Sequence, residues 1–109
     1  MARQDALQGS LPILILKLLD RRGPLHGYGL TAFIEQTSEE ALRVEEGSLY
    51  PALHRLEEAR QVRAKWVLTE NKRRARVYEI TPAGRKHLET EEERWRSVTA
   101  AVAQVLKLA

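Results

Sequence analysis

The sequence predicts an α+β fold that is mainly α, and three observations lead to that prediction. Residues 47–58 have the pattern of a short amphipathic helix. Two segments with the period-2 alternation of β-strands follow that helix and are joined by a basic tip. The segment after the second strand is mostly polar, with an apolar residue at every seventh position, and this pattern predicts one long C-terminal helix.

The length and the composition limit the kinds of protein this chain can be. At 109 residues it has the size of one domain, with little room for a deep catalytic cavity. We treat residues 1–81 and 82–109 as two parts of one structural unit. The sequence has no cysteine, glycine-rich phosphate loop, nucleophile elbow or paired catalytic carboxylates. We therefore expect neither an enzyme nor a bound cofactor.

The sequence also gives little support for a metal site or a membrane span. His26, His54 and His87 are far apart along the chain, so we expect no metal centre. The apolar run Leu11–Leu19 is interrupted by Lys17 and is too short to cross a bilayer, and no small-residue cleavage site follows it. We expect a cytosolic protein with no membrane partner.

The first helix is predicted to begin near Ser10, with Pro12 in its first turn, and to end before residues 22–24. Apolar residues occupy both of its sides, with Ile13 and Leu16 on the second side. A helix of this kind needs more than one packing neighbour.

A second helix is predicted to open within residues 25–30, because Leu30, Phe33 and Ile34 share one face. The free amides at its N-terminus are suited to holding a phosphate. Residues 42–44 are predicted to pair as a short strand before the next helix.

The third helix is predicted to start near Ser48, whose hydroxyl can cap the first turn. Pro51 is tolerable there if its missing N–H lies in the first turn, where it would have no intrahelical partner. One face of this helix is apolar. The other carries side chains that can reach phosphates or base edges in the major groove: Tyr50, His54 and Arg55.

Two acids follow these side chains on the same helix. Glu57 and Glu58 would repel phosphate, so the C-terminal half of the helix is expected to point away from DNA. An ordinary solvated helix face is the alternative interpretation of this segment alone.

A β-hairpin is predicted after the third helix. Val62, Ala64, Trp66 and Leu68 alternate with Arg63, Lys65 and Val67, and a second strand is expected over Arg76–Ile80, with Tyr78 and Ile80 facing inward. The loop of residues 69–75 is longer than a tight hairpin needs and carries the basic tip Lys72, Arg73, Arg74 and Arg76.

Positive charge is concentrated on this hairpin. Between Arg60 and Arg76 there are seven Lys or Arg residues and one acid, a local balance of +6 in a chain whose net charge is +3. A lone basic loop is usually a solvated charge run, but a capped helix followed by a cationic hairpin is typical of a winged helix-turn-helix that binds duplex DNA. Clustering of this kind indicates a nucleic-acid footprint.

The C-terminal helix is predicted to start at Thr81 as the cap and Pro82 as the first helical residue, and to run to about Leu108. Its heptad stripe, which is broken at Glu91, consists of Leu88, Trp95, Val98, Val102, Val105 and Ala109. We expect this long dimerisation helix to pair with its symmetry mate and with Ile13 and Leu16, although a monomeric arrangement is the alternative. A two-fold homodimer would place two recognition helices about 34 Å apart and would favour a palindromic DNA site.

Several segments together resemble the PadR-like family of bacterial transcriptional regulators. They are residues 25–29, 47–57, 73–78 and 80–84, together with Trp66. The resemblance covers nearly the whole chain in the family's order. It implies a homodimeric repressor that usually controls genes of stress response, detoxification or efflux and is often released by a small molecule.

The resemblance also implies roles for individual residues. The backbone contacts to DNA would be supported by His26, Gly27 and Tyr28; the operator would be faced by Ser48, Tyr50, Pro51, His54 and Arg55; and the wing would be furnished by Arg73, Arg74 and Arg76. The chain departs from the family at residues 60–62, where Arg-Gln-Val replaces the common Gly-Leu-Ile and removes a glycine C-cap. It also has Arg73 where glycine is frequent.

Trp95 lies on the predicted dimer stripe, where some drug-responsive relatives stack a planar ligand between two tryptophans. Two symmetry-related indoles would suit a small aromatic effector, with Trp66 as part of the same wall. The alternative is that Trp95 simply fills the dimer core. A different class of function also remains open, in which the winged helix is a protein-interaction module and its basic tip docks an acidic partner.

Overall fold

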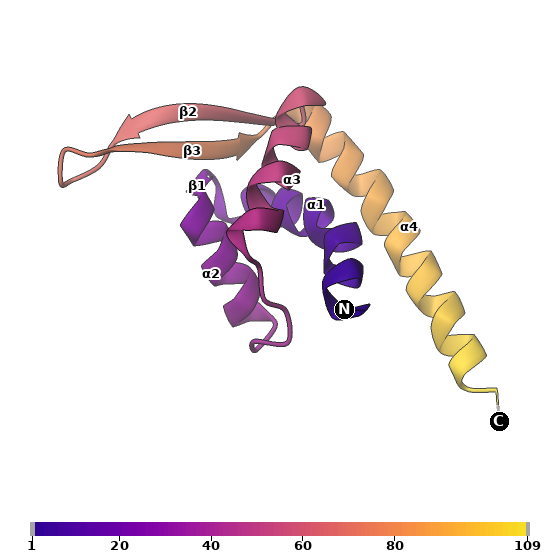
Figure 1. Cartoon of the computed structure of the whole chain (residues 1–109). Coiled ribbons are helices and arrows are strands. Elements are labelled where there is room, and N and C mark those ends of the chain that lie inside the picture. Colours follow the sequence, from indigo (N-terminus) through magenta and orange to yellow (C-terminus); the bar gives the residue numbers. More distant parts are fainter. Residues whose placement is uncertain (1, 109) are drawn as a thin grey trace.

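The computed structural model describes the fold of residues 2–108, and the side-chain environments of residues 9–108. The elements in chain order are α1 (Ala2–Arg22), β1 (Leu25–His26), α2 (Gly27–Thr37), α3 (Glu46–Glu58), β2 (Val62–Leu68), β3 (Arg74–Ile80) and α4 (Pro82–Leu106). The predicted α+β, mainly α, winged helix-turn-helix is confirmed. The molecule extends 59 × 28 × 21 Å, because the β2–β3 hairpin and α4 project from opposite sides of the helical body (Figure 1).

Helix α1 starts at Ala2 rather than near Ser10, so the predicted start is wrong and Pro12 lies inside the helix. A proline there removes one helical N–H, but the turns on both sides of it are fixed by burial of Leu11, Ile15 and Leu19 in the core. The expectation of several neighbours is confirmed, since α1 contacts α2, α3, α4 and β3.

The core collects apolar side chains from every helix and from the base of the hairpin. Its buried members are Leu11, Ile15, Leu16, Leu19, Leu30, Ile34, Val44, Leu49, Ala52, Leu53, Leu56, Val62, Tyr78, Ile80 and Leu88. The apolar face predicted for α3 is among them. Burial of this contiguous cluster is the main term that positions α3 and the hairpin relative to each other.

The sheet is antiparallel in the order β1-β3-β2. Strand β1 was not predicted, and it pairs with β3 through Leu25↔Tyr78 and His26↔Val77. The strand predicted at residues 42–44 is absent. The Val44 N–H instead donates a 3.0 Å hydrogen bond to Glu35 Oε2, and the Val44 side chain is buried.

Helix α3 begins two residues earlier than predicted. Its N-cap is Glu45 in an extended conformation, and the carbonyl of Glu45 accepts from the N–H groups of Ser48 and Leu49 at 3.0 and 2.9 Å. Ser48 is therefore inside the first turn rather than capping it. Pro51 lies beyond the first turn, so its missing N–H does cost one helical hydrogen bond.

The hairpin is longer and its turn tighter than predicted. Strand β3 starts at Arg74, so the connection shrinks to residues 69–73, closed by a 2.8 Å bond from the Thr69 N–H to the Arg73 carbonyl. Within this turn Lys72, and not Arg73, has a positive φ of 59°. Tyr78 and Ile80 face inward as predicted, but Trp66 and Leu68 are exposed because the distal hairpin extends beyond the core.

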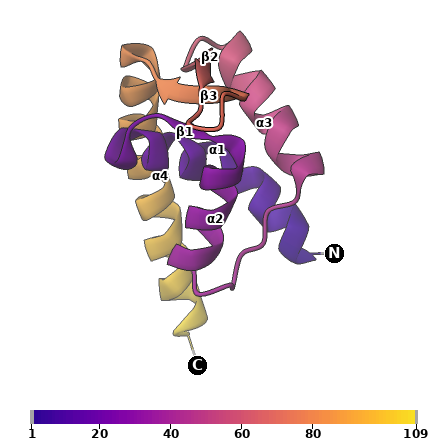
Figure 2. The same ribbon diagram turned by 90° about the vertical axis from the view of Figure 1, so that its left-hand side faces the viewer.

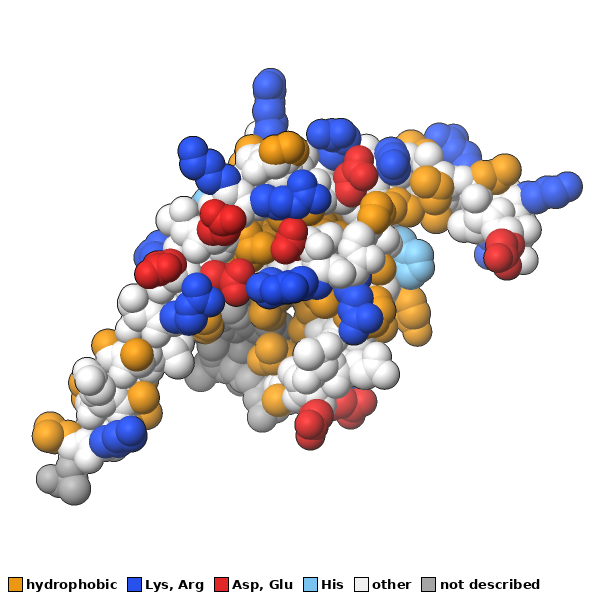
Figure 3. Space-filling model, turned by 180° about the vertical axis from the view of Figure 1, so that it is seen from behind, with side chains coloured by type: hydrophobic (Ala, Val, Ile, Leu, Met, Phe, Trp, Pro, Cys, Tyr) orange, Lys and Arg blue, Asp and Glu red, His pale blue; other side chains and the backbone are white. Residues whose placement is uncertain are grey.

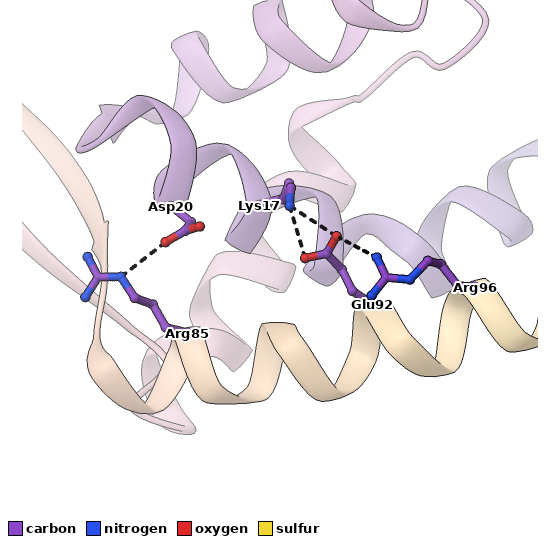
Figure 4. A network of polar contacts seen from close by, with 5 residues as sticks. All are labelled: Lys17, Asp20, Arg85, Glu92 and Arg96. Carbon is purple, nitrogen blue, oxygen red and sulfur yellow. Dashed lines mark hydrogen bonds and ion pairs between the residues drawn. The ribbon is translucent and has the colours of Figure 1, made fainter.

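Helix α4 starts as predicted, with the Thr81 side chain accepting a 3.0 Å hydrogen bond from the Gly84 N–H. Ion pairs fasten its first half to α1. Lys17 lies 3.1 Å from Glu92, and Asp20 lies 3.1 Å from Arg85 (Figure 4). Residues 93–106 of α4 are exposed. Within residues 2–108, no helix has both the length and the apolar character needed to cross a bilayer.

Candidate nucleic-acid interface

An open groove of about 1000 Å³ lies between the hairpin, the start of α2 and the exposed face of α3. Figure 2 looks toward the hairpin, with α2 and α3 next to each other. The groove is lined by His26, Gly27, Tyr28, Tyr50, His54, Glu57, Glu58, Trp66, Arg76 and Tyr78. Six of the residues predicted to serve DNA binding are thus brought together, although they come from four separate elements.

His26 is the N-cap of α2 and contributes a polar edge to this groove. Its Nδ1 accepts a 2.9 Å hydrogen bond from the Gly29 N–H. Nδ1 is therefore the unprotonated nitrogen, and Nε2 is the ring atom that can donate a hydrogen bond. The predicted set of free amides at this helix start is therefore reduced, because the Gly29 amide is already satisfied. Tyr28 beside it is highly exposed.

Gly27 provides space rather than a side chain. It is buried, and a Cβ at this position would lie 2.6 Å from the hydroxyl oxygen of Tyr50. No side chain larger than hydrogen fits while Tyr50 keeps this position. Gly27 thus allows α2 and α3 to approach closely enough for Tyr28 and Tyr50 to share one groove.

The outer face of α3 carries the predicted reading residues. Tyr50, Pro51, His54 and Arg55 are exposed, while Ser48 is half-buried. His54 Nδ1 lies 3.2 Å from Glu58 Oε1, one helical turn along. One ring nitrogen of His54, Nδ1, therefore already interacts with an acid on the same helix.

Glu57 and Glu58, in the C-terminal half of α3, line the same groove as Tyr50 and His54. The expectation that this half of the helix points away from DNA stays a prediction. Glu57 stays in the groove because Arg76 Nη2 donates to its Oε2 at 3.1 Å. The sequence argument considered only repulsion from phosphate and missed this partner on the hairpin. The ion pair joins residues 19 positions apart, a separation at which sequence spacing gives no signal.

Trp66 completes the inner surface of the hairpin. The guanidinium carbon of Arg74 lies 4.8 Å from the centre of its ring, and that of Arg76 lies 5.6 Å away. These are distances at which a cation is attracted to the face of an indole. Trp66 and Arg76 are also direct cross-strand partners.

The seven cations counted from the sequence divide between different surfaces. Arg63 and Lys65, on the other face of the hairpin, each lie 3.8 Å from the Glu79 carboxylate. Arg76 is bonded to Glu57. Arg60 lies at the end of α3. Lys72, Arg73 and Arg74 are the cations that remain at the hairpin tip.

Tyr78 lies at the base of the groove, and burial raises the pKa of its phenol above the ordinary value of 10.0. Arg76 opposes that rise in pKa, while Glu57 and Tyr50 add to it. The phenol is therefore a neutral, structural group.

Elsewhere in the described chain, no cluster of three His, Asp or Glu side chains has the arrangement needed to hold a metal ion.

The predicted dimer residues differ in burial and fall into three groups. Leu16 and Leu88 are only 0% and 3% exposed, so they belong to the protomer's own core and are removed from the predicted interface. Ile13 is half-buried. Trp95, Val98, Val102 and Val105 are between 49% and 69% exposed, along the free part of α4 where apolar side chains gather in Figure 3. Ala109 lies outside the described residues.

Trp95 and Trp66 do not share a wall within one protomer. Trp66 lines the groove, whereas Trp95 lines a hollow of about 440 Å³ between α1 and α4 with Ile13, Glu91 and Arg94. A second hollow of about 410 Å³ lies on the other side of Trp95 and Ile13. The sequence placed both indoles in one pocket because it could not show that the hairpin points away from α4.

The sequence model of the transcriptional regulator PadR-like family matches residues 15–90, which include α2, α3, the hairpin and the start of α4. The chain belongs to the PadR-like family of transcriptional regulators. It is a regulator with a DNA-binding winged helix, as the fold and the groove indicate.

Solved structures support this assignment to the PadR-like family. A transcriptional regulator from Clostridium thermocellum is 29% identical, with a TM-score of 0.85 over 94% of this chain and 99% of that chain. A PadR-like regulator from Bacillus cereus is 25% identical, with a TM-score of 0.82 over 96% and 99%. A PadR family regulator from Eggerthella lenta is 25% identical, with a TM-score of 0.79 over 97% and 89%.

Two curated relatives differ in how much of their length this PadR-like chain covers. A 37.1 kDa protein in a transposon of Streptomyces fradiae is 51% identical over 69 residues, which are 63% of this chain. The chain spans only 18% of that relative. A protein of Lysinibacillus sphaericus is 26% identical over 90% of this chain and 89% of its own length.

Proposed function

We propose that this PadR-like regulator is a homodimeric repressor that binds a palindromic operator of a stress, detoxification or efflux operon. The observation that carries the proposal is the pairing of two features in one chain. One is the groove with the basic hairpin tip at its edge, and the other is an exposed apolar stripe on α4. The groove suits duplex DNA, and the stripe suits a second copy of the chain.

The dimer follows from the cost of leaving the stripe in water. Trp95, Val98, Val102 and Val105 repeat at a/d spacing on a helix whose other residues are mostly polar. A contiguous apolar surface of this kind usually marks an interface. Two-fold pairing would bury both stripes at once and would hold the two grooves at one fixed separation.

Within each protomer, α3 and the hairpin tip take different tasks. Tyr50, His54 and Arg55 would meet base edges and phosphates in the major groove, with Ser48 and Pro51 beside them at the start of α3. His26 and Tyr28, with Gly27 as spacer, would contact the backbone. The tip residues Lys72, Arg73 and Arg74 would contact phosphates.

The hollow beside Trp95 supports release by a planar aromatic effector. It adjoins the apolar stripe, so a second copy would enclose it further and would bring a second indole near the first. Glu91, Arg94 and His87 supply polar groups at its wall. A flat ligand with a polar edge matches this chemistry.

The experiment is a titration of the protein against the DNA upstream of its own gene at several salt concentrations, with footprinting. Operator binding is expected to be steeply salt-dependent and to protect a two-fold symmetric site. Tyr50→Ala and Arg55→Ala are expected to erode the preference for that site over a scrambled duplex. Equal binding of both duplexes by the unmodified protein would instead favour a module that docks an acidic protein.

A further inference from the structure

Arg76 links the hairpin to α3, although its side chain is still 43% exposed. Its guanidinium donates to Glu57 at 3.1 Å and lies against the ring of Trp66, its cross-strand partner. The Glu57 side chain is only 27% exposed, so the pair forms part of the groove wall. The three residues connect the middle of the hairpin to α3.

The hairpin needs such a connection because the core reaches only its base. Val62, Tyr78 and Ile80 are buried, whereas Trp66 and Leu68 farther out are exposed. Figure 1 shows the outer half of β2 and β3 extending clear of the helices. Without a contact beyond the core, the angle between the hairpin tip and α3 would vary.

We propose that Glu57 is a positioning residue, which holds the wing at the angle that operator binding requires through its bond to Arg76, whose guanidinium also lies over Trp66. Arg76 thereby serves as a tether and not as a phosphate contact, unlike Lys72, Arg73 and Arg74. The inference rests on the proposed DNA binding. Its energetic basis is pre-organisation, because a wing already at the binding angle loses less conformational freedom when it docks.

Charge makes the tether distinguishable from a phosphate contact. A cation that neutralises a phosphate releases counterions and contributes about 0.9 to the slope of log affinity against log salt. Arg76 is already neutralised by Glu57, so its removal should leave that slope unchanged. The change should appear instead in the preference for the operator.

The test compares Glu57→Gln, Arg76→Gln, the double variant and Glu58→Gln by fluorescence anisotropy with operator and scrambled duplexes at several salt concentrations. Glu58→Gln is the matched control, because it removes the same charge from the same groove but its partner is His54. Relative to that control, Glu57→Gln is expected to bind the operator roughly three- to fivefold more weakly, the size of one exposed ion pair. The double variant should lose no more than either single variant.

A charge exchange, Glu57→Arg with Arg76→Glu, should restore much of the operator preference, because it rebuilds the pair with reversed signs. A salt slope that falls by about 0.9 in Arg76→Gln would identify a phosphate contact and would overturn the tether. Equal operator affinity in Glu57→Gln and Glu58→Gln would overturn it as well.

A second measurement needs no DNA and so separates the tether from the proposed function. In a Trp95→Phe background Trp66 is the single tryptophan, and its fluorescence anisotropy reports motion of the hairpin. Glu57→Gln should lower this anisotropy, whereas Glu58→Gln should not. Unchanged anisotropy in Glu57→Gln overturns the tether even if DNA binds, while lowered anisotropy without any duplex binding overturns the proposed function and keeps the mechanical link.

Discussion

The hydroxyl of Thr81 donates a 2.7 Å hydrogen bond to the backbone carbonyl of Arg60, 21 residues earlier in the chain. The same hydroxyl accepts from the Gly84 N–H, and the Thr81 N–H donates to the Gln61 carbonyl at 3.1 Å. The end of α3 and the start of α4 are therefore joined through one side chain. A Cβ on Gly84 would collide with the Gln61 carbonyl oxygen, so this junction also requires the glycine.

Thr81→Val should lower the free energy of unfolding by about 1–2 kcal/mol, because it removes a helix cap and leaves the Arg60 carbonyl without its donor. Thr81→Ser keeps the hydroxyl and should stay within about 0.5 kcal/mol of the unmodified protein. Urea denaturation at one fixed protein concentration measures both values. Equal stability of the Val and Ser variants would show that the hydroxyl is unimportant.

Arg60 occupies the position after the C-cap of α3, where glycine is the favoured residue. Its φ is +60°, and the N–H groups of Arg60 and Gln61 donate to the carbonyls of Glu57 and Leu56 at 2.9 Å, which is the Schellman pattern. Arg60→Gly should therefore raise the free energy of unfolding by about 0.5–1 kcal/mol. Ala59→Gly, at a φ of −79°, is the control and should lower it. Denaturant unfolding of the two variants would contradict this account if both changed in the same direction.

The parts of the fold that the sequence predicted are those set by local chemistry. The apolar spacing of α3 and the Thr81-Pro82 start of α4 involve residues within a few positions of each other, and both are confirmed. The starts of α1 and α3 were misplaced because Pro12 and Pro51 were taken as first-turn markers. The acids Glu45 and Glu46 were the better signal for α3, since negative charge favours a helix start.

Many residues of the groove could be predicted from the sequence, but their arrangement in space could not. Strand β1 forms only because Leu25 lies opposite Tyr78, a pairing across more than fifty residues. Counting cations from 60 to 76 could not show which face of the hairpin each one occupies. The Arg76–Glu57 pair depends on how the hairpin lies over α3, and that is fixed by core packing rather than by sequence spacing.

The tip cations should contribute to DNA binding through phosphate charge. Arg73→Ala and Arg74→Ala are expected to weaken binding to operator and scrambled duplexes alike, and to reduce the salt slope by about 0.9 each. Arg63→Ala is the control, because that cation lies on the other hairpin face near Glu79. Titrations at several salt concentrations test the assignment, and an undiminished slope in Arg73→Ala would place that residue away from phosphate.

The buried phenol of Tyr78 should make stability fall in alkaline solution. Burial raises its pKa in the folded protein above the ordinary value of 10.0, so the unfolded chain loses this proton first as the pH rises. The contribution of the protonated Tyr78 phenol to the free energy of unfolding is complete below about pH 10. It is lost as the pH rises through the folded-state pKa. Tyr78→Phe should show a shallower decline in unfolding free energy between about pH 9 and 11, with Tyr28→Phe as the exposed control. Identical pH profiles for Tyr78→Phe and the unmodified protein would contradict it.

The apolar stripe on α4 should fail as an interface when it carries charge. In a two-fold pair Val102→Glu would place a carboxylate from each copy in the same apolar seam, and burial of unpaired charge should weaken the dimer by at least about 100-fold. Gln104→Glu adds the same charge about 200° around the helix, outside the stripe, and should leave the dimer intact. Sedimentation equilibrium at micromolar concentrations, with circular dichroism to verify the fold, separates the two. If Val102→Glu sediments as the unmodified protein does, the copies pair elsewhere or not at all, and the fixed spacing of two grooves on one palindrome is lost with them.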